Sequence, residues 1–232
     1  MSEINILVVD DEKEIAELVE IYLVSDGYRV FKAENAREGL EILEKENIHL
    51  VLLDIMMPGM NGLEMCRKIR ETNNIPIIML SAKSTDLDKI LGLGTGADDY
   101  VVKPFNPLEV VARVKAQLRQ YMRYKQPCIK QEAERTEYDI RGMTISKSNH
   151  KCILFGKEIQ LTPTEFSILW YLCERQGTVV STEELFEAVW GERYFDSNNT
   201  VMAHIGRLRE KMKEPSRNPK FIKTVWGVGY TI

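Results

Sequence analysis

His49-Leu-Val-Leu-Leu-Asp54-Ile-Met-Met-Pro58-Gly59 is the stretch that decides the fold. A mostly apolar run of strand length ends on one carboxylate, and a Pro-Gly turn follows. An apolar run bounded by turn residues predicts a strand buried on both faces of a parallel sheet. Asp54 would then lie at the carboxyl end of the strand, where open α/β sheets bind ligands. Taken alone, such an aspartate is more often an ordinary loop carboxylate, so the other strand ends decide its role.

The composition is that of a globular chain without a membrane segment. At 232 residues there is room for two domains, and 44% of the residues are hydrophobic and 28% charged. No apolar run approaches the roughly 18 residues that cross a bilayer, and the acidic N-terminus lacks the basic start of a secretory signal. The cysteines lack metal-site spacing, which predicts free thiols in the cytoplasm; they are Cys66, Cys128, Cys152 and Cys173.

Charge is distributed unevenly along the chain. Residues 1–120 hold 14 Lys/Arg against 21 Asp/Glu, a net charge of −7, and residues 121–232 hold 17 against 14, a net charge of +3. The last stretch, 201–232, has seven basic and two acidic residues. This asymmetry indicates an acidic module joined to one whose end meets a polyanion.

Residues 1–121 form the first predicted domain, in which strand and helix patterns alternate five times. We expect strands at 4–9, 28–33, 49–54, 76–80 and 99–102. Apolar residues at helical spacing predict helices over 15–23, 36–46, 63–71, 87–91 and 110–118. Five such units in succession predict an α/β fold, a doubly wound, five-stranded parallel sheet with helices on both faces. No G-x-G-x-x-G or Walker A motif occurs, which argues against nucleotide binding by those routes.

A polar stretch, 122–137, carries one proline and little apolar periodicity, and we interpret it as a linker. Residues 138–232 then form the second predicted domain. Short alternating segments at 140–145, 151–155 and 158–161 suggest a small antiparallel sheet. Cap signals open helices at Thr162-Pro163, at Ser181 and at Asp196 or Ser197, and 221–232 reads as a hairpin. The second domain is therefore a smaller α+β domain.

Parallel topology brings the ends of four strands to one edge of the first sheet. The polar residues there are Asp10, Asp11, Asp54, Ser81 and Lys103. Clustered carboxylates are costly without a cation, and a compact set of hard oxygen ligands suits Mg²⁺. Asp54 could then act as a nucleophile towards a phosphoryl donor, with Lys103 offsetting the charge on the transferred group. Each residue alone has an ordinary structural role, but the combination is hard to assign to chance.

These residues belong to motifs spread along the first domain. The motifs are Val-Val-Asp10-Asp11-Glu12, Leu-Asp54-Ile-Met-Met-Pro58-Gly59, Leu80-Ser81-Ala82, Gly96-Ala-Asp98-Asp99-Tyr100 and Lys103-Pro104-Phe105. Together they resemble the OmpR/PhoB family of two-component response regulators, and the likeness covers essentially the whole chain. The segments Lys103–Glu109 and Thr224–Tyr230 are most similar to VanR-type regulators of Gram-positive cells, which implies control of cell-envelope or antibiotic-response genes.

The resemblance implies a CheY/flavodoxin-like receiver followed by a winged-helix DNA-binding domain. Asp54 would accept phosphate from a sensor histidine kinase. Mg²⁺ would be held by Asp10, Asp11, Asp54 and the backbone carbonyl of Met56. Ser81 and Tyr100 would form the switch pair, and Lys103, joined to Pro104 by a cis peptide, would bind the phosphoryl group.

The family also implies a homodimer that forms on phosphorylation. Lys89 matches a contact with Glu109, while Asp98 and Asp99 match contacts with arginines of the last helix of the first domain. Arg113 matches one of these arginines. Gln120 stands where the other is common, so one ion pair would be lost unless Arg119 or Arg123 substitutes. Exposed ion pairs contribute about 0–1 kcal/mol each, so the loss should weaken dimerisation without abolishing it.

In the second domain the likeness makes the helix after Ser197 the one that reads the major groove of promoter DNA. Its predicted buried stripe is Val201, Ile205, Leu208 and Met212. Asn199, His204 and Arg207 would meet bases or phosphates, with Thr200 beside them and Arg209 and Lys211 nearer the DNA backbone. Gly206 replaces a basic residue common in relatives, and the same family implies contact with RNA polymerase.

The predicted hairpin, 221–232, would be the wing of that domain. Trp226 occupies a position where an arginine often enters the minor groove. Either Lys223 or Thr231 compensates, or Trp226 packs against the protein, and each outcome predicts a base preference different from arginine-wing relatives.

Three other functions compete with a phosphorylation-activated transcription factor that is not an enzyme. A regulator that works without phosphorylation conflicts with the complete acidic set. A phosphotransfer enzyme for a small substrate lacks a pocket signature. A protein-interaction module would make no contact with DNA, so salt-dependent binding to a duplex distinguishes it from a transcription factor.

Overall fold

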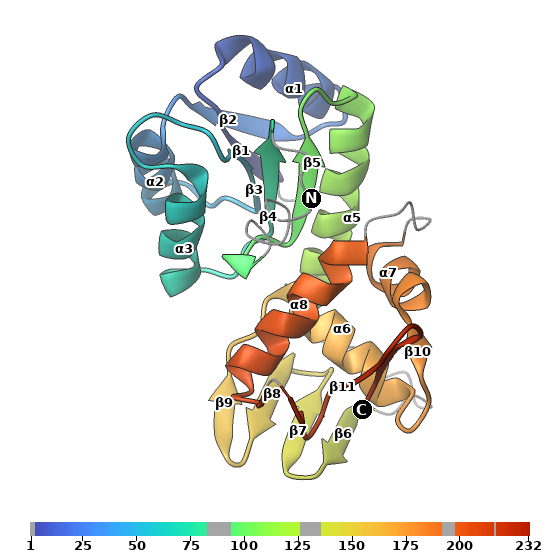
Figure 1. Cartoon of the computed structure of the whole chain (residues 1–232). Coiled ribbons are helices and arrows are strands. Elements are labelled where there is room, and N and C mark those ends of the chain that lie inside the picture. Colours follow the sequence, from blue (N-terminus) through green and yellow to red (C-terminus); the bar gives the residue numbers. More distant parts are fainter. Residues whose placement is uncertain (1–2, 83–93, 126–135, 192–197, 216) are drawn as a thin grey trace. The chain divides into compact units, whose positions relative to one another are not determined.

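The computed structural model describes residues 3–82, 94–125, 136–191, 198–215 and 217–232 (Figure 1). Contacts divide the chain into two compact units, Met1–Tyr121 and Met122–Ile232. They are called the N-terminal and C-terminal units below, and each is considered by itself. Within the described part, no helix has the length and apolar character needed to span a membrane.

A five-stranded parallel sheet forms the centre of the N-terminal unit and confirms the predicted α/β fold. Its strand order is β2-β1-β3-β4-β5. The strands are β1 (Asn5–Val9), β2 (Arg29–Ala33), β3 (Leu50–Asp54), β4 (Ile77–Ser81) and β5 (Asp99–Val102). The helices are α1 (Lys13–Ser25), α2 (Ala36–Lys45), α3 (Gly62–Thr72) and α5 (Pro107–Lys125). The helix expected over 87–91 lies outside the described residues.

Apolar side chains of the central strands face both sides of this sheet. Every residue of β3 is buried, as its continuous apolar run predicts. Leu50 and Leu52 join one core with residues of α1 and α5, whereas α2 and α3 cover the opposite face (Figure 1). The sheet is therefore shielded on both faces, and its carboxyl edge is left to carry polar side chains.

The C-terminal unit starts with a four-stranded antiparallel sheet in the order β6-β7-β8-β9. Its strands are β6 (Glu137–Ile140), β7 (Met143–Ser146), β8 (Lys151–Leu154) and β9 (Lys157–Ile159). The single segment predicted over 140–145 is wrong, because the chain turns there. Arg141 and Gly142 have φ angles of 53° and 89°, the left-handed pair that closes a two-residue hairpin.

Three helices and a small sheet complete the described part of this unit. The helices are α6 (Pro163–Glu174), α7 (Thr182–Trp190) and α8 (Asn198–Lys211). Thr162 caps α6 in a capping box with Glu165, and the Ser181 side chain caps α7. The predicted hairpin forms as β11 (Lys223–Val225) and β12 (Gly229–Thr231), and the unpredicted strand β10 (Val180–Ser181) pairs with β12.

Candidate functional site

The carboxyl edge of the N-terminal sheet gathers polar residues from separate strands. Asp10 follows β1, Asp54 ends β3 and Ser81 ends β4, and all three side chains are buried. Register explains the grouping, since Asp54 pairs with Leu80 and Ser81 pairs with Val102 in neighbouring strands. The backbone N–H of Glu12 donates to Asp10 Oδ1 at 3.0 Å, which fixes that carboxylate at the start of the following turn.

Lys103 reaches into this cluster from the end of β5. Its Nζ lies 2.8 Å from Asp10 Oδ2, 3.3 Å from Asp54 Oδ1 and 3.2 Å from Glu12 Oε1. The peptide between Lys103 and Pro104 is cis, as the family resemblance implied. The ammonium thus bridges the two buried carboxylates and partly balances their charge.

The carboxylate set fits a divalent cation with oxygen ligands. Asp10, Asp11 and Asp54 each offer an oxygen, and these oxygens lie within 4.8 Å of one another. Asp10 and Asp54 are buried whereas Asp11 is exposed, so the set opens to solvent on one side. Mg²⁺ favours this kind of site, with a few carboxylates and positions left for water or a phosphoryl oxygen. The role of the Met56 carbonyl stays a prediction; its side chain is exposed.

Burial dominates the electrostatics of the cluster. Desolvation raises the pKa of Asp54 to about 6, against the opposing effect of Lys103. The pKa of Asp10 is also raised, again chiefly by burial. Burial lowers the pKa of Lys103, but the hydrogen bond to Asp10 and the charges of Asp54 and Asp10 together raise it above its ordinary value. Two buried carboxylates with one ammonium therefore leave negative charge that a cation would neutralise.

This pKa makes a testable prediction for Mg²⁺ binding. Because the pKa of Asp54 is raised to about 6, a proton competes with the cation below that pH and is absent well above it. We expect calorimetric titration to give Mg²⁺ affinity roughly tenfold lower at about pH 5 than at about pH 7.5. Asp54→Asn should remove most of the affinity and its pH dependence, whereas Glu44→Gln, an exposed carboxylate on α2, should change neither. Equal affinity at both pH values would contradict the assignment.

Glycine allows the backbone to close around Asp54. A Cβ atom on Gly62 would lie 2.0 Å from the Asp54 carbonyl oxygen, so only glycine fits where α3 begins. The N–H of Gly62 donates to the Ile55 carbonyl at 3.1 Å, and Gly59 has a φ angle of +78° in the preceding turn. The Pro-Gly turn quoted at the outset therefore returns the chain directly over the carboxylate strand.

The expected switch residues lie on the two neighbouring strands. Ser81 is fully buried, and the Tyr100 side chain is 7% exposed. Tyr100 pairs in register with Met79, two residues before Ser81. The structure thus places both side chains on the β4–β5 side of Asp54, and their role as a switch pair stays a prediction.

The charged residues expected to link two subunits are paired within the chain. Arg70 Nη2 donates to Asp98 Oδ2 at 2.7 Å, and Arg113 Nη1 lies 3.1 Å from Asp99 Oδ1. Arg113 also pairs with Glu109 at 3.0 Å. The expectation that Asp98 faces outward is corrected, because it is fully buried and also accepts from the Ile77 N–H.

Three further residues were expected to bear on contacts between subunits. Lys89 lies outside the described residues, as does the side chain of Arg123. Gln120 is half-buried on α5. Whether α5 and β5 meet a second copy therefore stays a prediction.

In the C-terminal unit the predicted buried stripe is confirmed, since Val201, Ile205 and Leu208 of α8 and Met212 just after it are all buried. The exposed face is narrower than expected. Gly206 and Glu210 are exposed, together with Met202, which is 46% exposed. Thr200, His204 and Arg207, expected to face DNA, are buried instead, as is Ala203. The side chain of Asn199 lies outside the described part.

Specific partners account for these corrections. Arg207 Nη2 lies 2.7 Å from Glu165 Oε1, and the His204 ring is 5.5 Å from the ring of Trp190. Lys211 Nζ also binds Glu165, at 2.7 Å, and donates to the Gln160 carbonyl. The carboxylate that holds both cations lies on another helix, so no pattern within α8 indicates that they are paired.

Arg209 connects α8 to the wing, the hairpin of β11 and β12. Its Nη2 donates to the Ile222 carbonyl and to Thr224 Oγ1, both at 2.8 Å. Trp226 at the hairpin tip is 90% exposed, so the alternative that it packs against the protein is wrong. Lys223 is exposed at the start of β11.

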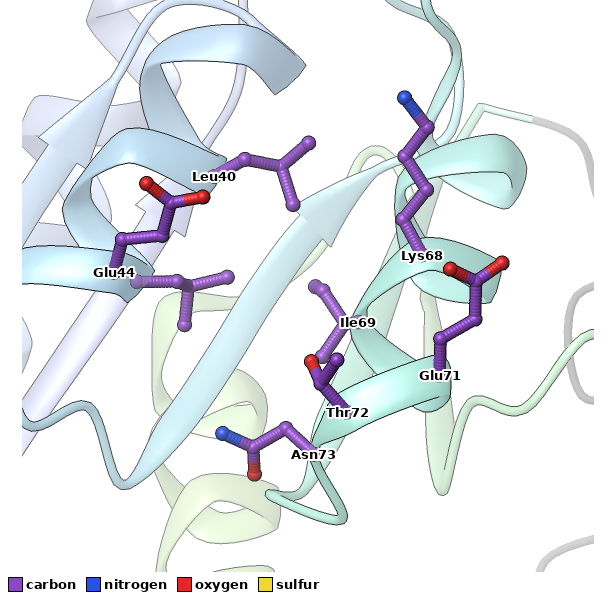
Figure 2. A pocket seen from close by; sticks show the side chains of 8 residues that line it. Leu40, Glu44, Lys68, Ile69, Glu71, Thr72 and Asn73 are labelled. Atoms are coloured by element: carbon purple, nitrogen blue, oxygen red, sulfur yellow. The ribbon is translucent and has the colours of Figure 1, made fainter.

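A separate groove of about 470 Å³ lies between α2 and α3 (Figure 2). Leu40 and Ile69 point into it, and Glu44, Lys68 and Glu71 lie along its rim. None of the carboxylates at the sheet edge lines it. The groove therefore adds no chemistry to the site at Asp54.

Sequence reasoning missed two residues that hold these sites together. Arg70 binds Asp98 together with the carbonyls of Gly96, Asn73 and Ile75. Glu165 was detectable as the last residue of the Thr162-Pro-Thr-Glu165 pattern, which is typical of a capping box. Its second role as partner of Arg207 and Lys211 has no local sequence signal.

Comparison with known proteins gives the same two-part organisation. Residues 6–115 match the response regulator receiver domain, and residues 156–232 match the C-terminal domain of transcriptional regulatory proteins. Over 232 residues the chain is 56% identical to the regulatory protein VanRc of Enterococcus gallinarum, covering 100% of this chain and 99% of that protein.

Two more relatives are similar over almost their full length. The regulatory protein VanR of Enterococcus faecium is 54% identical over 229 residues, with 98% of each chain covered. The crystal structure of the response regulator DrrB, a Thermotoga maritima OmpR/PhoB homologue, has 35% identity and a TM-score of 0.50, covering 99% of this chain and 98% of that chain.

Proposed function

Because the chain belongs to the two-component response regulators, with a receiver and a winged-helix DNA-binding domain of the OmpR/PhoB family, we propose that phosphorylation of Asp54 controls its binding to promoter DNA. The observation that carries the proposal is the buried Asp54 carboxylate, 3.3 Å from Lys103 and grouped with Asp10 and Asp11. The regulator works in the cytoplasm, and a sensor histidine kinase is its phosphoryl donor. The similarity to VanR proteins supports target genes of the cell envelope or antibiotic response.

Phosphoryl transfer uses the chain's own groups for attack and charge balance. An oxygen of Asp54 forms the new O–P bond while the P–N bond of the kinase phosphohistidine breaks, and the imidazole keeps the electron pair. Lys103 stays within reach of the transferred oxygens and offsets their charge. Mg²⁺, held by Asp10, Asp11, Asp54 and the Met56 carbonyl, would supply further neutralisation of the phosphoryl oxygens. The family consists of transcription regulators, so Asp54 is a receiver of phosphate and not the centre of a turnover enzyme.

The magnitude of the switch is within reach of these contacts. Moving a two-state domain from 1:99 to 99:1 requires about 5.5 kcal/mol. Hydrogen bonds to a charged phosphoryl group contribute about 1.5–3 kcal/mol each, so Ser81 and Lys103 supply most of that amount. Homodimerisation through β5 and α5, with Tyr100 following the state of Ser81, supplies the rest.

DNA binding belongs to α8 and the wing. We propose that α8 enters the major groove of promoter DNA with Asn199 near the bases, while the buried Thr200, His204 and Arg207 hold the helix in position. Arg209 and Lys211 support the helix from the positions described above, while Lys223 and Trp226 contact DNA from the wing. RNA polymerase is the remaining proposed partner, reached once the regulator is bound at a promoter.

The experiment that tests the proposed function is duplex binding as a function of salt. The full chain, with and without a small-molecule phosphodonor, is titrated against random duplex DNA and against a duplex pool selected by the wild-type protein. We expect the logarithm of affinity to fall linearly with the logarithm of salt concentration, because cationic side chains of the protein release the counterions bound to DNA phosphates. Phosphorylation should tighten binding to the selected pool. Flat salt dependence, or absence of duplex binding in both states, would favour an interaction module without DNA contact.

A further inference from the structure

A second pocket, of about 420 Å³, lies in the C-terminal unit and is called the corner pocket below. Its volume is typical of ligand sites. It is formed by the β6–β7 and β8–β9 hairpin turns and by the chain at 218–223, where β11 begins. The lining residues are Arg141, Phe155, Asn218, Pro219, Lys220, Phe221 and Lys223. Three of these residues are cations and none is a carboxylate, so the corner pocket is electropositive.

Both hairpin turns hold a large side chain in an unfavourable backbone conformation. Arg141 and Phe155 have φ angles of 53° and 46°, and a glycine follows each of them. The left-handed region is costly for a residue with a Cβ atom, and the first position of such a turn is ordinarily Asn, Asp or Gly. An arginine and a phenylalanine at these two positions therefore indicate a role outside the turns, because strained backbone is concentrated at ligand sites.

The two turns pack against each other and form an apolar wall. The N–H of Phe155 donates to the Gly142 carbonyl at 2.8 Å. A Cβ atom on Gly142 would lie 2.7 Å from Phe155 Cε1, so the ring rests directly on that glycine. The ring centroids of Phe155 and Phe221 are 6.2 Å apart. Phe221 is buried whereas Phe155 is 66% exposed, so one aromatic face of the wall is open to an apolar ligand group.

The cations of the corner pocket retain capacity for an anion. Arg141 Nη1 donates to the Lys220 carbonyl at 2.6 Å, which fixes the guanidinium in place. Within the part of the chain that the structure describes, neither Arg141 nor Lys220 has an ion-pair partner. The nearby Glu214 does not line the pocket, and its carboxylate accepts from the N–H groups of Phe221 at 2.6 Å and Ile222 at 3.3 Å. A guanidinium has five N–H donors, so most of them remain for a ligand.

We propose that the corner pocket binds an acidic peptide segment of a partner protein. Arg141 and Lys220 hold a carboxylate of the segment, and an apolar side chain of the segment lies against Phe155. A guanidinium binds a carboxylate through two parallel hydrogen bonds, and the Asn218 amide can donate to and accept from a peptide backbone. A nucleotide fits less well, because no lining residue is glycine and phosphate chains are bound by backbone N–H groups of glycine-rich turns.

This interaction goes beyond the proposed function and can be tested separately from it. Lys223 is the one lining residue that is also proposed to contact DNA. The test therefore changes Arg141, Lys220 and Phe155, none of which has a proposed role in phosphorylation or in DNA binding.

Fluorescence anisotropy with the full-length protein measures the binding. The probe is a labelled pool of capped hexapeptides, built from Asp, Glu, Phe and Leu in the pattern acidic-acidic-apolar-acidic-acidic-apolar. We expect saturable binding that weakens with salt. Arg141→Gln and Lys220→Gln each remove a charge-assisted contact and should weaken binding about tenfold. Phe155→Ala removes only an apolar contact, so it should weaken binding roughly fivefold without changing the salt dependence. Lys220→Gln leaves both hairpin turns intact, so its result decides the test should Arg141→Gln misfold.

The matched control is Arg175→Gln. It removes a guanidinium of the same unit that is paired with Glu184 and does not line the corner pocket, so affinity should not change. A pool with Asn and Gln in place of the acids should not bind, and amide shifts of isotope-labelled protein should place the acidic pool at Gly142 and Phe155.

Four results would overturn the proposal while leaving the proposed function standing. The first two are absence of saturable binding by the acidic pool and equal binding by all variants. ATP that binds more tightly than the pool and displaces it would mark a nucleotide site. Displacement of the pool by random duplex DNA, together with weaker duplex binding by Arg141→Gln, would mark a DNA contact.

Discussion

Asp54→Asn is expected to abolish dimerisation in response to phosphorylation. The amide keeps the size of the side chain but cannot form the O–P bond, so a phosphodonor leaves Ser81 and Lys103 without a phosphoryl partner. Sedimentation velocity of wild type with and without a small-molecule phosphodonor should show the dimer dissociation constant fall by at least tenfold, which corresponds to about 1.4 kcal/mol. The variant should sediment identically under both conditions.

A matched control separates loss of phosphorylation from loss of folding. Glu44→Gln removes an exposed carboxylate of α2, away from the sheet edge, and should dimerise like wild type. Asp54→Asn should itself be folded and somewhat stabilised at neutral pH, because burial raises the pKa of Asp54 to about 6. The folded state then holds the proton of Asp54 more tightly than the unfolded chain does. The free energy of unfolding therefore falls as the pH rises from the pKa of Asp54 in the unfolded chain through its folded-state pKa of about 6. A wild-type sedimentation profile that ignores the phosphodonor would overturn the switch.

The largest expected loss of stability is that of Glu165→Ala in the C-terminal unit. Glu165 is fully buried, accepts from the Thr162 N–H at 2.8 Å, and pairs with Arg207 and Lys211 at 2.7 Å each. Removing one partner of a buried ion pair leaves uncompensated charge and costs about 3–5 kcal/mol. Chemical denaturation followed by tryptophan fluorescence reports on this unit, because Trp170, Trp190 and Trp226 all lie in it.

The control for this loss is an exposed ion pair of the same unit. Lys151 and Glu158 lie 3.1 Å apart with side chains 49% and 42% exposed, so Glu158→Gln should cost at most about 1 kcal/mol. Equal losses for the two variants would show that Glu165 does not carry the buried pair assigned to it.

The same carboxylate predicts an acid limit for the C-terminal unit. Burial works to raise the pKa of Glu165, but the charges of Arg207 and Lys211 prevail and lower it from the ordinary 4.5. A carboxylate whose pKa is lowered by folding contributes stability at pH values above its pKa in the unfolded chain. This contribution is lost as the pH falls through its pKa in the folded state. Wild-type stability should therefore decline below about pH 4.5 more steeply than that of Glu165→Ala, and parallel pH profiles would contradict this.

Local patterns in the sequence determined the fold class and the carboxylate site. An apolar run of strand length such as 50–53, bounded by turn residues, favours a strand covered on both faces. Parallel topology then brings Asp10, Asp54, Ser81 and Lys103 to one edge. Cap signals at Thr162 and Ser181 are equally local, because a capping side chain bonds backbone groups two or three residues away. These features follow from chain geometry over short distances and could be predicted without coordinates.

Only the tertiary structure decided which charges are free to act. Asp98 forms an ion pair with Arg70, 28 positions away in the sequence, and Arg207 forms one with Glu165. Residues that the sequence suggests as exposed contacts are therefore paired inside the protein. Trp226 shows the reverse, since an indole that composition would bury is exposed at a held hairpin tip. The energetic contribution of a charged or apolar group depends on its burial and on its distance from partners in space. Folding sets both, and the order of residues along the chain does not show them directly.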